Sequence, residues 1–402
     1  MRPRDAKIIL KDHELALPGS RGFVNEHLER LRALPAHGNR TLHIDQAFLG
    51  LLLAFFEPLV RSLRTIESCG DFGGRLDLQR LARSTMSDAM RVFDPAHLKP
   101  VIHDLQARVP HLASTDADLH EIARRIIAAD GTYLTTLVNT TWALRHTKSN
   151  GKGQGQVRVN VQMDVATWTP QVVTVSGDDG ESEAAAFARD LLSDVLYVID
   201  RNFLEFSFLN QLLEKDNDFV LRIRANAPAT QVILARPLTP ADVEAGVIRD
   251  EIVLLTGRDA PVGEFRQVTI ISTNRHGEAE TIGLLTNLMN EAAAHVIGAI
   301  YRQRWQIELF FKWFKTWARM DHLLSASRNG ITFQLYVAVI AVLMIYVQTG
   351  RRVSIYALVA LNQMAHGQMT FEQVMAVINR RERERELERA RQARRRAQKK
   401  LA

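Results

Sequence analysis

The chain has 402 residues, of which 46% are apolar and 24% are charged, and its formal net charge is +6. This composition is typical of a folded globular protein and excludes a disordered chain, while the length predicts two or three domains. The single cysteine, Cys69, excludes an intramolecular disulfide framework and a cysteine-rich zinc site.

Most of the basic charge lies at the C-terminal end. From Arg380 onwards there are eleven basic and four acidic residues, a net of +7, which leaves −1 for residues 1–379. A nucleic-acid surface in the body must therefore be a local patch. No signal peptide is visible, and the apolar stretch 331–349, interrupted by Gln334 and Gln348, is expected to be a buried helix of a soluble, cytoplasmic protein without a membrane partner.

Residues 1–120 are expected to form a helical, DNA-binding N-terminal domain. Apolar periodicity predicts helices over residues 25–34, 44–63, 77–93 and 95–109. A break at Ser84 would divide the third of these, and its second half would expose Ser87 and Arg91, as in a helix-turn-helix. A plain helical hairpin fits this weak pattern equally well.

From Ile126 the pattern becomes that of alternating strands and helices. Strands are predicted over 126–130, 156–165, 171–175, 195–200 and 219–224, and helices over 182–192 and 203–213. The order βββαβαβ, with acids on the first and fourth strands, is the layout of a ribonuclease-H-like fold. The predicted fold class is therefore α/β, a mixed sheet flanked by helices, with residues 121–226 as the first part of the core.

Residues 227–290 differ from the core in composition and predict an all-β insertion. Short strands over 232–234, 247–255, 265–272 and 280–285 are separated by Pro, Gly and Asp turns, and a helix is possible over 240–245. Residues 291–350 would complete the core, followed by C-terminal helices and a basic tail over 351–402. The alternating Arg and Glu residues of that tail fit a solvated helix or a disordered segment.

The stretch 301–315 carries a row of polar residues at helical spacing. At about 100° per residue, these residues fall within roughly 80° of arc: Tyr301, Arg304, Glu308, Lys312 and Lys315. A neighbouring apolar stripe has the period of a buried face: Ile300, Ile307, Phe311 and Phe314. The polar row therefore either faces a cleft beside the core or forms ordinary exposed pairs between successive turns.

Three acids stand at positions that the predicted fold brings together. Asp130 closes the first strand, Asp200 closes the fourth, and Glu308 lies on the helix after the insertion. Such a cluster suits Mg²⁺, a hard cation, and two ions could support an in-line displacement at phosphorus. Other acids lie in turns, within strands or at a strand start and rank lower: Asp164, Asp178, Asp179, Asp194, Asp216 and Asp218.

Tyr301, Arg304, Glu308 and Lys315 match the Y-(2)-R-(3)-E-(6)-K signature of bacterial DDE transposases of the insertion-sequence-four family. Asp130 in Ala-Ala-Asp-Gly-Thr and Asp200 in Val-Ile-Asp-Arg-Asn-Phe resemble the other two acids of that family. The resemblance covers roughly residues 120–350. The four-residue signature is specific, whereas either aspartate motif alone would be weak.

The resemblance implies cut-and-paste DNA transposition. Asp130, Asp200 and Glu308 would be catalytic and would hold two Mg²⁺ ions, for which Mn²⁺ could substitute. Tyr301, Arg304, Lys312 and Lys315 would contact DNA phosphates. Implied partners are the element ends, the target DNA and a second copy of the chain.

Some features of this reaction vary among relatives of the family. Several relatives pass through a hairpin intermediate. Relatives also stack a flipped base on an aromatic residue from the insertion, and in this chain either Phe265 or no residue takes that role. Lys148 and Lys152, in a glycine-rich loop, could touch the DNA backbone. Two other functions stay open: a catalytically silent, transposon-derived DNA-binding protein, and a stand-alone Mg²⁺-dependent endonuclease.

Overall fold

The computed structural model describes residues 20–35, 42–57, 60–70, 81–109, 119, 122–137, 139–147, 153–177, 180–223, 230–273, 278–316, 320, 322–350, 355–365 and 368–401. The chain divides into two units, one made of Met1–Pro110 with Lys315–Ala402 and the other of His111–Phe314. The second unit carries all three predicted acids.

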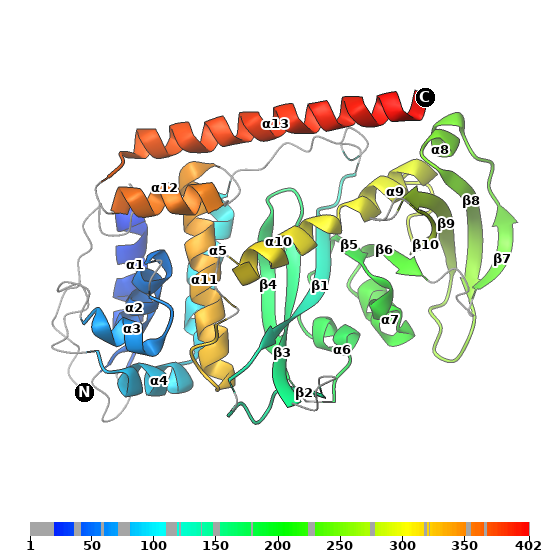
Figure 1. Ribbon diagram of the computed structural model, residues 1–402. Coiled ribbons are helices and arrows are strands. Elements are labelled where there is room, and N and C mark those ends of the chain that lie inside the picture. Colours follow the sequence, from blue (N-terminus) through cyan, green and yellow to red (C-terminus); the bar gives the residue numbers. More distant parts are fainter. Residues whose placement is uncertain are drawn as a thin grey trace. The chain divides into compact units, whose positions relative to one another are not determined.

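The unit His111–Phe314 is built on one mixed sheet, in which ten strands are described (Figure 1). The strands are β1 (Ile126–Thr135), β2 (Leu144–Thr147), β3 (Gly153–Asp164), β4 (Thr169–Ser176), β5 (Leu196–Ile199), β6 (Asp218–Ile223), β7 (Thr230–Ala235), β8 (Val247–Leu255), β9 (Glu264–Thr273) and β10 (Ala279–Thr286). Their order is β2-β3-β1-β5-β6-β10-β9-β8-β7, and β4 pairs with β3.

Strand directions in the first half of the sheet agree with the βββαβαβ prediction. β1 runs antiparallel to β3 and parallel to β5, and β5 runs parallel to β6. The short strand β2 is additional, because it occupies part of the segment expected to be a loop. Lys148 and Lys152 of that loop lie outside the described residues.

Both faces of the central strands are buried, which explains their continuous apolar runs. In β5, Tyr197 and Ile199 belong to one apolar cluster, while Leu196 and Val198 belong to another. The first cluster includes Phe187 and Phe208 from α6 (Glu183–Ala188) and α7 (Phe206–Glu214), and the second includes Ile297 and Ile300 from α9 (Ala294–Arg302). The sheet therefore separates α6 and α7 from α9 (Figure 1).

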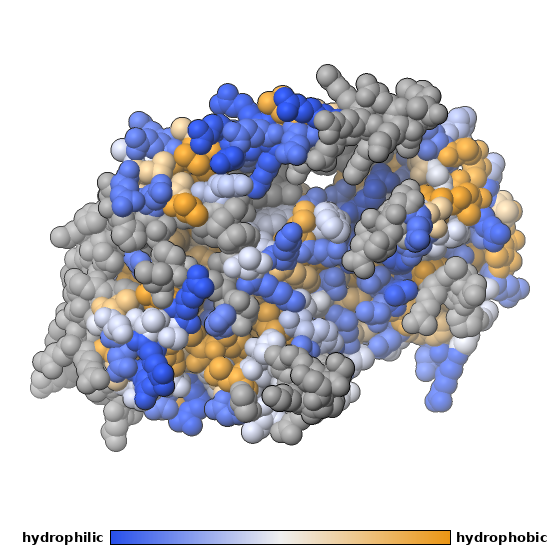
Figure 2. All heavy atoms as spheres, in the orientation of Figure 1, coloured by the Kyte–Doolittle hydropathy of each residue, from blue (hydrophilic) through white to orange (hydrophobic). Residues whose placement is uncertain are grey.

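The insertion is not a separate β domain, because its strands extend the same sheet. β10 pairs antiparallel with β6, and β9, β8 and β7 follow outwards. The short helix α8 (Pro240–Glu244) confirms the possible helix within it. At the outer edge, Val232, Ile233 and Leu234 of β7 are 52, 47 and 59% exposed, and hydrophobic side chains gather at that end of the sheet in Figure 2.

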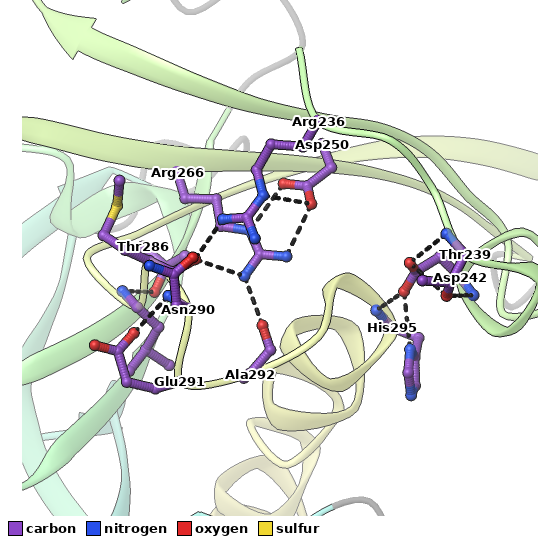
Figure 3. Close-up of polar contacts among 12 residues, drawn as sticks. Arg236, Thr239, Asp242, Asp250, Arg266, Thr286, Asn290, Glu291, Ala292 and His295 are labelled. Atoms are coloured by element: carbon purple, nitrogen blue, oxygen red, sulfur yellow. Dashed lines mark hydrogen bonds and ion pairs between the residues drawn. The ribbon is translucent and has the colours of Figure 1, made fainter. Parts of the chain in front are cut away.

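A buried polar network ties the insertion to the segment that leads into α9 (Figure 3). Arg266 on β9 donates through Nε and Nη2 to the two carboxylate oxygens of Asp250 on β8, both at 2.8 Å. Its Nη1 donates to the Ala292 carbonyl oxygen at 2.6 Å. Closer to α9, Asp242 accepts hydrogen bonds at 2.8 Å from the backbone N–H of His295 and lies 2.8 Å from its Nδ1. These contacts fix the start of the helical segment that carries Glu308.

Helices make up the other unit, among its described residues. They are α1 (Ser20–Arg32), α2 (Ile44–Phe56), α3 (Leu63–Ser68), α4 (Arg83–Val92), a 3₁₀ turn (Pro95–Leu98), α5 (Lys99–Arg108), α11 (Arg328–Thr349), α12 (Ile355–Ala365) and α13 (Phe371–Leu401). The prediction of one helix over 44–63 is wrong, because α2 ends at Phe56 and α3 begins at Leu63. Pro58, which disfavours helix in the residue before it, lies between them in the sequence.

The predicted break at Ser84 is also wrong. Ala82 has an extended backbone, α4 begins at Arg83, and Ser84 lies in the first turn of a continuous helix. Ser87 is half-buried, whereas the Arg91 side chain is 64% exposed. The first helix of the possible helix-turn-helix falls largely on residues 71–80, outside the described residues.

Among the described residues, α11 is the one helix long and apolar enough to cross a membrane by length and composition, and 83% of its most apolar window is buried in the structure. It contacts α2, α4 and α5, which is the packing expected of a core helix. Its contacts place it with the N-terminal helices, whereas it was predicted to belong to the second part of the core. α13 shows that the charged tail is helical through Leu401.

Candidate active site

Asp130 and Asp200 lie at the same level on two neighbouring parallel strands. In the pairing of β1 with β5, Ala128 stands opposite Val198, and each aspartate comes two residues later. Because side chains alternate along a strand, both aspartates follow the face that Leu196 and Val198 turn towards α9. Asp200 directly follows β5, as predicted, but β1 continues past Asp130 to Thr135. The sheet thus brings the two carboxylates to one place.

Glu308 is held on α10 (Trp305–Thr316) by the apolar side of that helix. Ile307, Phe310 and Phe314 are each at most 1% exposed, whereas the Glu308 side chain is 40% exposed. The Phe310 ring packs edge-on against Trp168, with 5.7 Å between centroids. Aromatic contacts of this kind fix the rotation of the helix. The predicted buried stripe is therefore confirmed, and Glu308 lies beside it.

The predicted continuous helix over 301–315 is interrupted before Glu308. α9 ends at Arg302, and a turn at Gln303 and Arg304 precedes α10. Backbone N–H groups here donate to the carbonyl three residues earlier, as in Gln306 to Gln303 at 2.9 Å and Ile307 to Arg304 at 3.1 Å. These tighter bonds turn the chain. Tyr301 is therefore on one helix and Glu308 on the next, and the polar residues do not form a single straight row.

Arg304 links two of the three predicted acids. Its Nη2 donates to Glu308 Oε1 at 2.6 Å, and its Nη1 donates to Asp130 Oδ2 at 3.4 Å. Its guanidinium also lies 5.8 Å from the centre of the Tyr301 ring. Although burial lowers the pKa of Arg304, the neighbouring Tyr301, Glu308 and Asp200 outweigh it and raise that pKa. Arg304 is thus a fixed positive charge inside the acidic site.

Burial raises the pKa of Asp130 to about 7. Arg304 and the backbone N–H of Gly131, which donates to Asp130 Oδ1 at 2.8 Å, lower it, while Glu183 and Asp200 raise it. A carboxylate held so far from its ordinary range among other acids is typical of a functional site. An additional positive charge nearby would lower the pKa of Asp130 and favour its ionised form.

The other predicted DNA contacts lie on both sides of this turn. Tyr301 is 8% exposed, and burial raises the pKa of its hydroxyl. Lys312 is exposed and Lys315 is half-buried in the last turn of α10. Phe265 is 2% exposed and packs in the core beside Phe219, so a base-stacking role for Phe265 is wrong.

Two further side chains near the site were not predicted from the sequence. Trp305, next to Arg304, is 58% exposed and offers an open aromatic surface. Glu183, at the start of α6, lies against Gly131, on the face of β1 opposite to Asp130. Burial raises the pKa of Glu183, Arg158 lowers it, and Asp200 raises it further. In the sequence, Glu183 is marked only by a Ser-Glu pair at a helix start, and this pattern is equally typical of a helix cap.

The acids that ranked lower have other contacts. Asp164 accepts from the backbone N–H groups of Ala166 and Thr167, as a turn residue does. Three others pair with Arg124: Asp194, Asp216 and Asp218. Asp178 and Asp179 lie outside the described residues.

The carboxylate oxygens at this site are suitable ligands for a divalent cation, although in this structure they are not assembled around a common point. Within the described ranges, no three Asp, Glu, His or Cys side chains stand close enough together to hold a metal ion. Like charges repel, and Arg304 pairs with Asp130 and Glu308. Asp200 Oδ1 is a buried oxygen with no hydrogen-bond partner, and hard carboxylate oxygens are what Mg²⁺ and Mn²⁺ take as ligands.

Comparison with known proteins identifies the class. A family model described as "Transposase DDE domain" matches residues 121–344, which is more than half of the chain. The chain therefore belongs to the DDE transposase family, as predicted. The matched range includes Asp130, Asp200 and Glu308.

The chain is also similar to individual proteins that are named as transposases. The chain is 26% identical to the transposase y4zB of Sinorhizobium fredii, over 69% of this chain and 76% of that protein. It is 22% identical to a transposase for the insertion sequence element IS4SA of Synechocystis, over 76% and 81% of the two chains. A piggyBac transposase in a synaptic complex with hairpin DNA aligns with a TM-score of 0.42 and 11% identity, over 93% of this chain and 80% of that one.

Proposed function

We propose that the chain is an active insertion-sequence transposase that excises its element and joins it to target DNA by phosphodiester hydrolysis and strand transfer. The observation that carries the proposal is the convergence of Asp130 and Asp200, on adjacent parallel strands, with Glu308, which Arg304 links to Asp130. A DNA-binding protein without catalysis would have no need for three acids at these positions.

The proposal includes a ribonuclease-H-like core with Asp130, Asp200 and Glu308 as the ligands of two Mg²⁺ ions, which Mn²⁺ could replace. Bound ions of this kind supply charge neutralisation at the phosphate and a more acidic water or hydroxyl nucleophile. The protein contributes the position of its carboxylates: Asp130 lies within β1, Asp200 directly follows β5, and Glu308 lies on a helix held by Phe310 and Phe314. Rigid supports of this kind keep reacting groups aligned.

The DNA would lie along the turn and helix that carry the signature residues. Arg304 offers a planar, permanently charged group suited to a phosphate, and Lys312 and Lys315 extend the positive charge along α10. Tyr301 would hydrogen-bond a phosphate near the cut, and the exposed face of Trp305 could stack on an unpaired base. For Arg304 to contact DNA, it has to release Glu308 or Asp130, or bridge the phosphate to them.

Two copies would act together, because two element ends are cut in one reaction, and the cytoplasm, where bacterial DNA lies, would be the location. The test uses a supercoiled donor plasmid that carries the element ends, incubated with the chain and Mg²⁺. Excision at the element ends supports the proposal. Gel shifts without cleavage would support a silent DNA-binding protein, and nicking without end specificity would support a stand-alone endonuclease.

A further inference from the structure

The loop between β3 and β4 carries a tryptophan in a backbone conformation that bulky residues rarely adopt. Trp168 has a φ of 55°, in the left-handed region that glycine takes most easily at the end of a hairpin loop. Among the described residues, the other non-glycine positions with positive φ are all aspartates: Asp194, Asp216 and Asp259. Aspartate is enriched in this conformation, whereas a bulky side chain there is an outlier. Such strain persists only where the surrounding structure holds the residue in place.

The Trp168 side chain is held against α10. Trp168 is 6% exposed, and the centre of its ring lies 5.7 Å from that of Phe310. Three more rings have their centres 5.6 to 6.2 Å from the centre of the Phe310 ring: Phe311, Trp313 and Phe314. Those three belong to α10 itself, so Trp168 is the one of the four rings that comes from outside the helix. Glu308 precedes Phe310 by two residues, so any movement of the helix at this contact would displace its carboxylate.

The same loop is fastened to β1, the strand that carries Asp130. The backbone N–H of Val165 donates to the Ile126 carbonyl oxygen at 3.0 Å. Within the loop, Asp164 Oδ1 accepts hydrogen bonds of 2.9 and 3.1 Å from two backbone N–H groups. These bonds close the loop on itself and on the beginning of β1. The loop therefore connects the strand of one predicted acid with the helix of another.

We propose that Trp168 is a positioning residue, which acts through Phe310 to hold Glu308 where it can work together with Asp130 and Asp200. This inference rests on the proposed function. It explains why the loop has a strained tryptophan at a position where glycine would be unstrained. The competing role is that of an ordinary core residue, whose loss would lower stability without changing the reaction of the folded protein.

The experiment compares Trp168→Leu with wild type, with Trp168→Phe and with Phe187→Leu, each in the full-length chain. Phe187 is the matched control, because it is an aromatic residue with 2% exposure in the cluster beneath α6 and α7, and no described member of that cluster belongs to α10. Three quantities are measured on folded protein: the cleavage rate at saturating DNA, the dissociation constant for a labelled element end, and amide hydrogen exchange over residues 305–316.

We expect the cleavage rate of Trp168→Leu to fall by about a hundredfold, because a misplacement of about 1 Å caused far from the chemistry can cost that much. Its DNA affinity should stay within about twofold of wild type, and exchange over residues 305–316 should become about tenfold faster. Trp168→Phe keeps a smaller ring against Phe310 and should lose roughly three- to tenfold in cleavage rate. In Phe187→Leu, all three quantities should stay within about twofold.

Each other outcome has a distinct meaning. A cleavage rate of Trp168→Leu within about twofold of wild type would overturn the inference and leave the proposed function standing, whatever the exchange over residues 305–316. An equal loss of cleavage in Phe187→Leu would show a general effect of core damage and would also overturn it. Absence of cleavage by the wild type would overturn the proposed function and the inference with it. If Trp168→Leu does not fold, Trp168→Phe decides: a wild-type cleavage rate contradicts the inference, and a loss of at least threefold at unchanged DNA affinity supports it.

Discussion

The Arg304 guanidinium donates a hydrogen bond of 2.6 Å to the carboxylate of Glu308, one turn further along the chain. An exposed pair with this spacing contributes little to stability. Here the same guanidinium also reaches Asp130, 174 positions earlier, so the pair belongs to the site and not to the surface of a helix. Arg304 holds the helix that carries Glu308 against the strand that carries Asp130.

We expect Glu308→Gln to abolish DNA cleavage while leaving binding to the element ends largely intact. The amide oxygen of glutamine can still accept from Arg304, but the negative charge needed for a metal ligand is lost. Cleavage should fall by about a thousandfold or more, roughly 4 kcal/mol at about 1.36 kcal/mol per factor of ten. Plasmid excision and gel-shift titration measure the two properties separately. Glu291→Gln, an exposed position before α9, is the control, and robust cleavage by Glu308→Gln would contradict the assignment.

Asp130→Asn should stabilise the metal-free protein, and more so as the pH rises. In the folded protein, the pKa of Asp130 is raised to about 7. The stability that this carboxyl contributes is therefore fully present below its unfolded pKa, about 3.9, and is lost as the pH rises through its folded pKa. The asparagine variant has no such loss. Its advantage over wild type should therefore grow by about 1.36 kcal/mol per pH unit between about pH 5 and 7, and then level off.

Urea denaturation at pH 5, 6, 7 and 8 with a chelator present would measure this difference. Asp259→Asn removes a carboxylate whose side chain is 79% exposed, and its effect should not vary with pH. A constant difference between Asp130→Asn and wild type over this range would show that the Asp130 carboxyl is not perturbed in the fold.

Several features of the site follow from the sequence because they depend on local rules. The apolar run of β5 ends at Asp200, so the position of that acid could be predicted from the strand alone. The strand predicted over residues 247–255 coincides with β8, which directly follows Gly246 and ends two residues before Gly257. Alternation along neighbouring strands then predicts that Asp130 and Asp200 share a face.

Other features depend on contacts between distant parts of the chain. Apolar periodicity continues through Gln303 and Arg304, and nothing local shows that the backbone tightens there while Arg304 reaches Asp130. Glu183 is 52 positions from Gly131, and only the folded structure shows that the missing side chain of one makes room for the other. The pairing of β10 with β6 makes the insertion part of the sheet. The local sequence likewise does not show which strand edge β10 pairs with.

Asp250→Asn should destabilise the protein strongly. The side chains of Asp250 and Arg266 are 4% and 1% exposed, and Arg236 Nε lies 3.6 Å from the same carboxylate. The substitution leaves two arginines without their buried counter-charge, which costs about 3–5 kcal/mol for a pair of this kind. Urea denaturation would measure the loss. Glu251→Gln, at the next and less buried position of β8, should change stability by less than about 0.5 kcal/mol. Equal stabilities of the two variants would contradict this account of the network in Figure 3.

Removing the end of α13 should weaken DNA binding mainly at low salt. Residues 386–402 contain seven basic and two acidic residues. The deletion keeps Arg381 and Arg385, whose guanidinium carbons lie 4.6 and 5.7 Å from the centre of the Tyr356 ring, so the contact between α12 and α13 survives. Phosphate contacts release counterions, and each contributes about 0.9 to the slope of log affinity against log salt concentration.

If three or four of these residues touch DNA, the slope should become shallower by about 2 to 4, and the affinities of the two proteins should converge as salt increases. Fluorescence anisotropy with a labelled element end, between roughly 50 and 300 mM salt, measures the slope. Screening of phosphate contacts increases across this range, because the Debye length shortens as the salt concentration rises. The double variant Glu386→Gln, Glu388→Gln raises the positive charge of the same helix and should leave the slope unchanged or steeper. An unchanged slope in the deletion would show that residues 386–402 do not contact DNA, since the loss of phosphate contacts cannot leave counterion release unaltered.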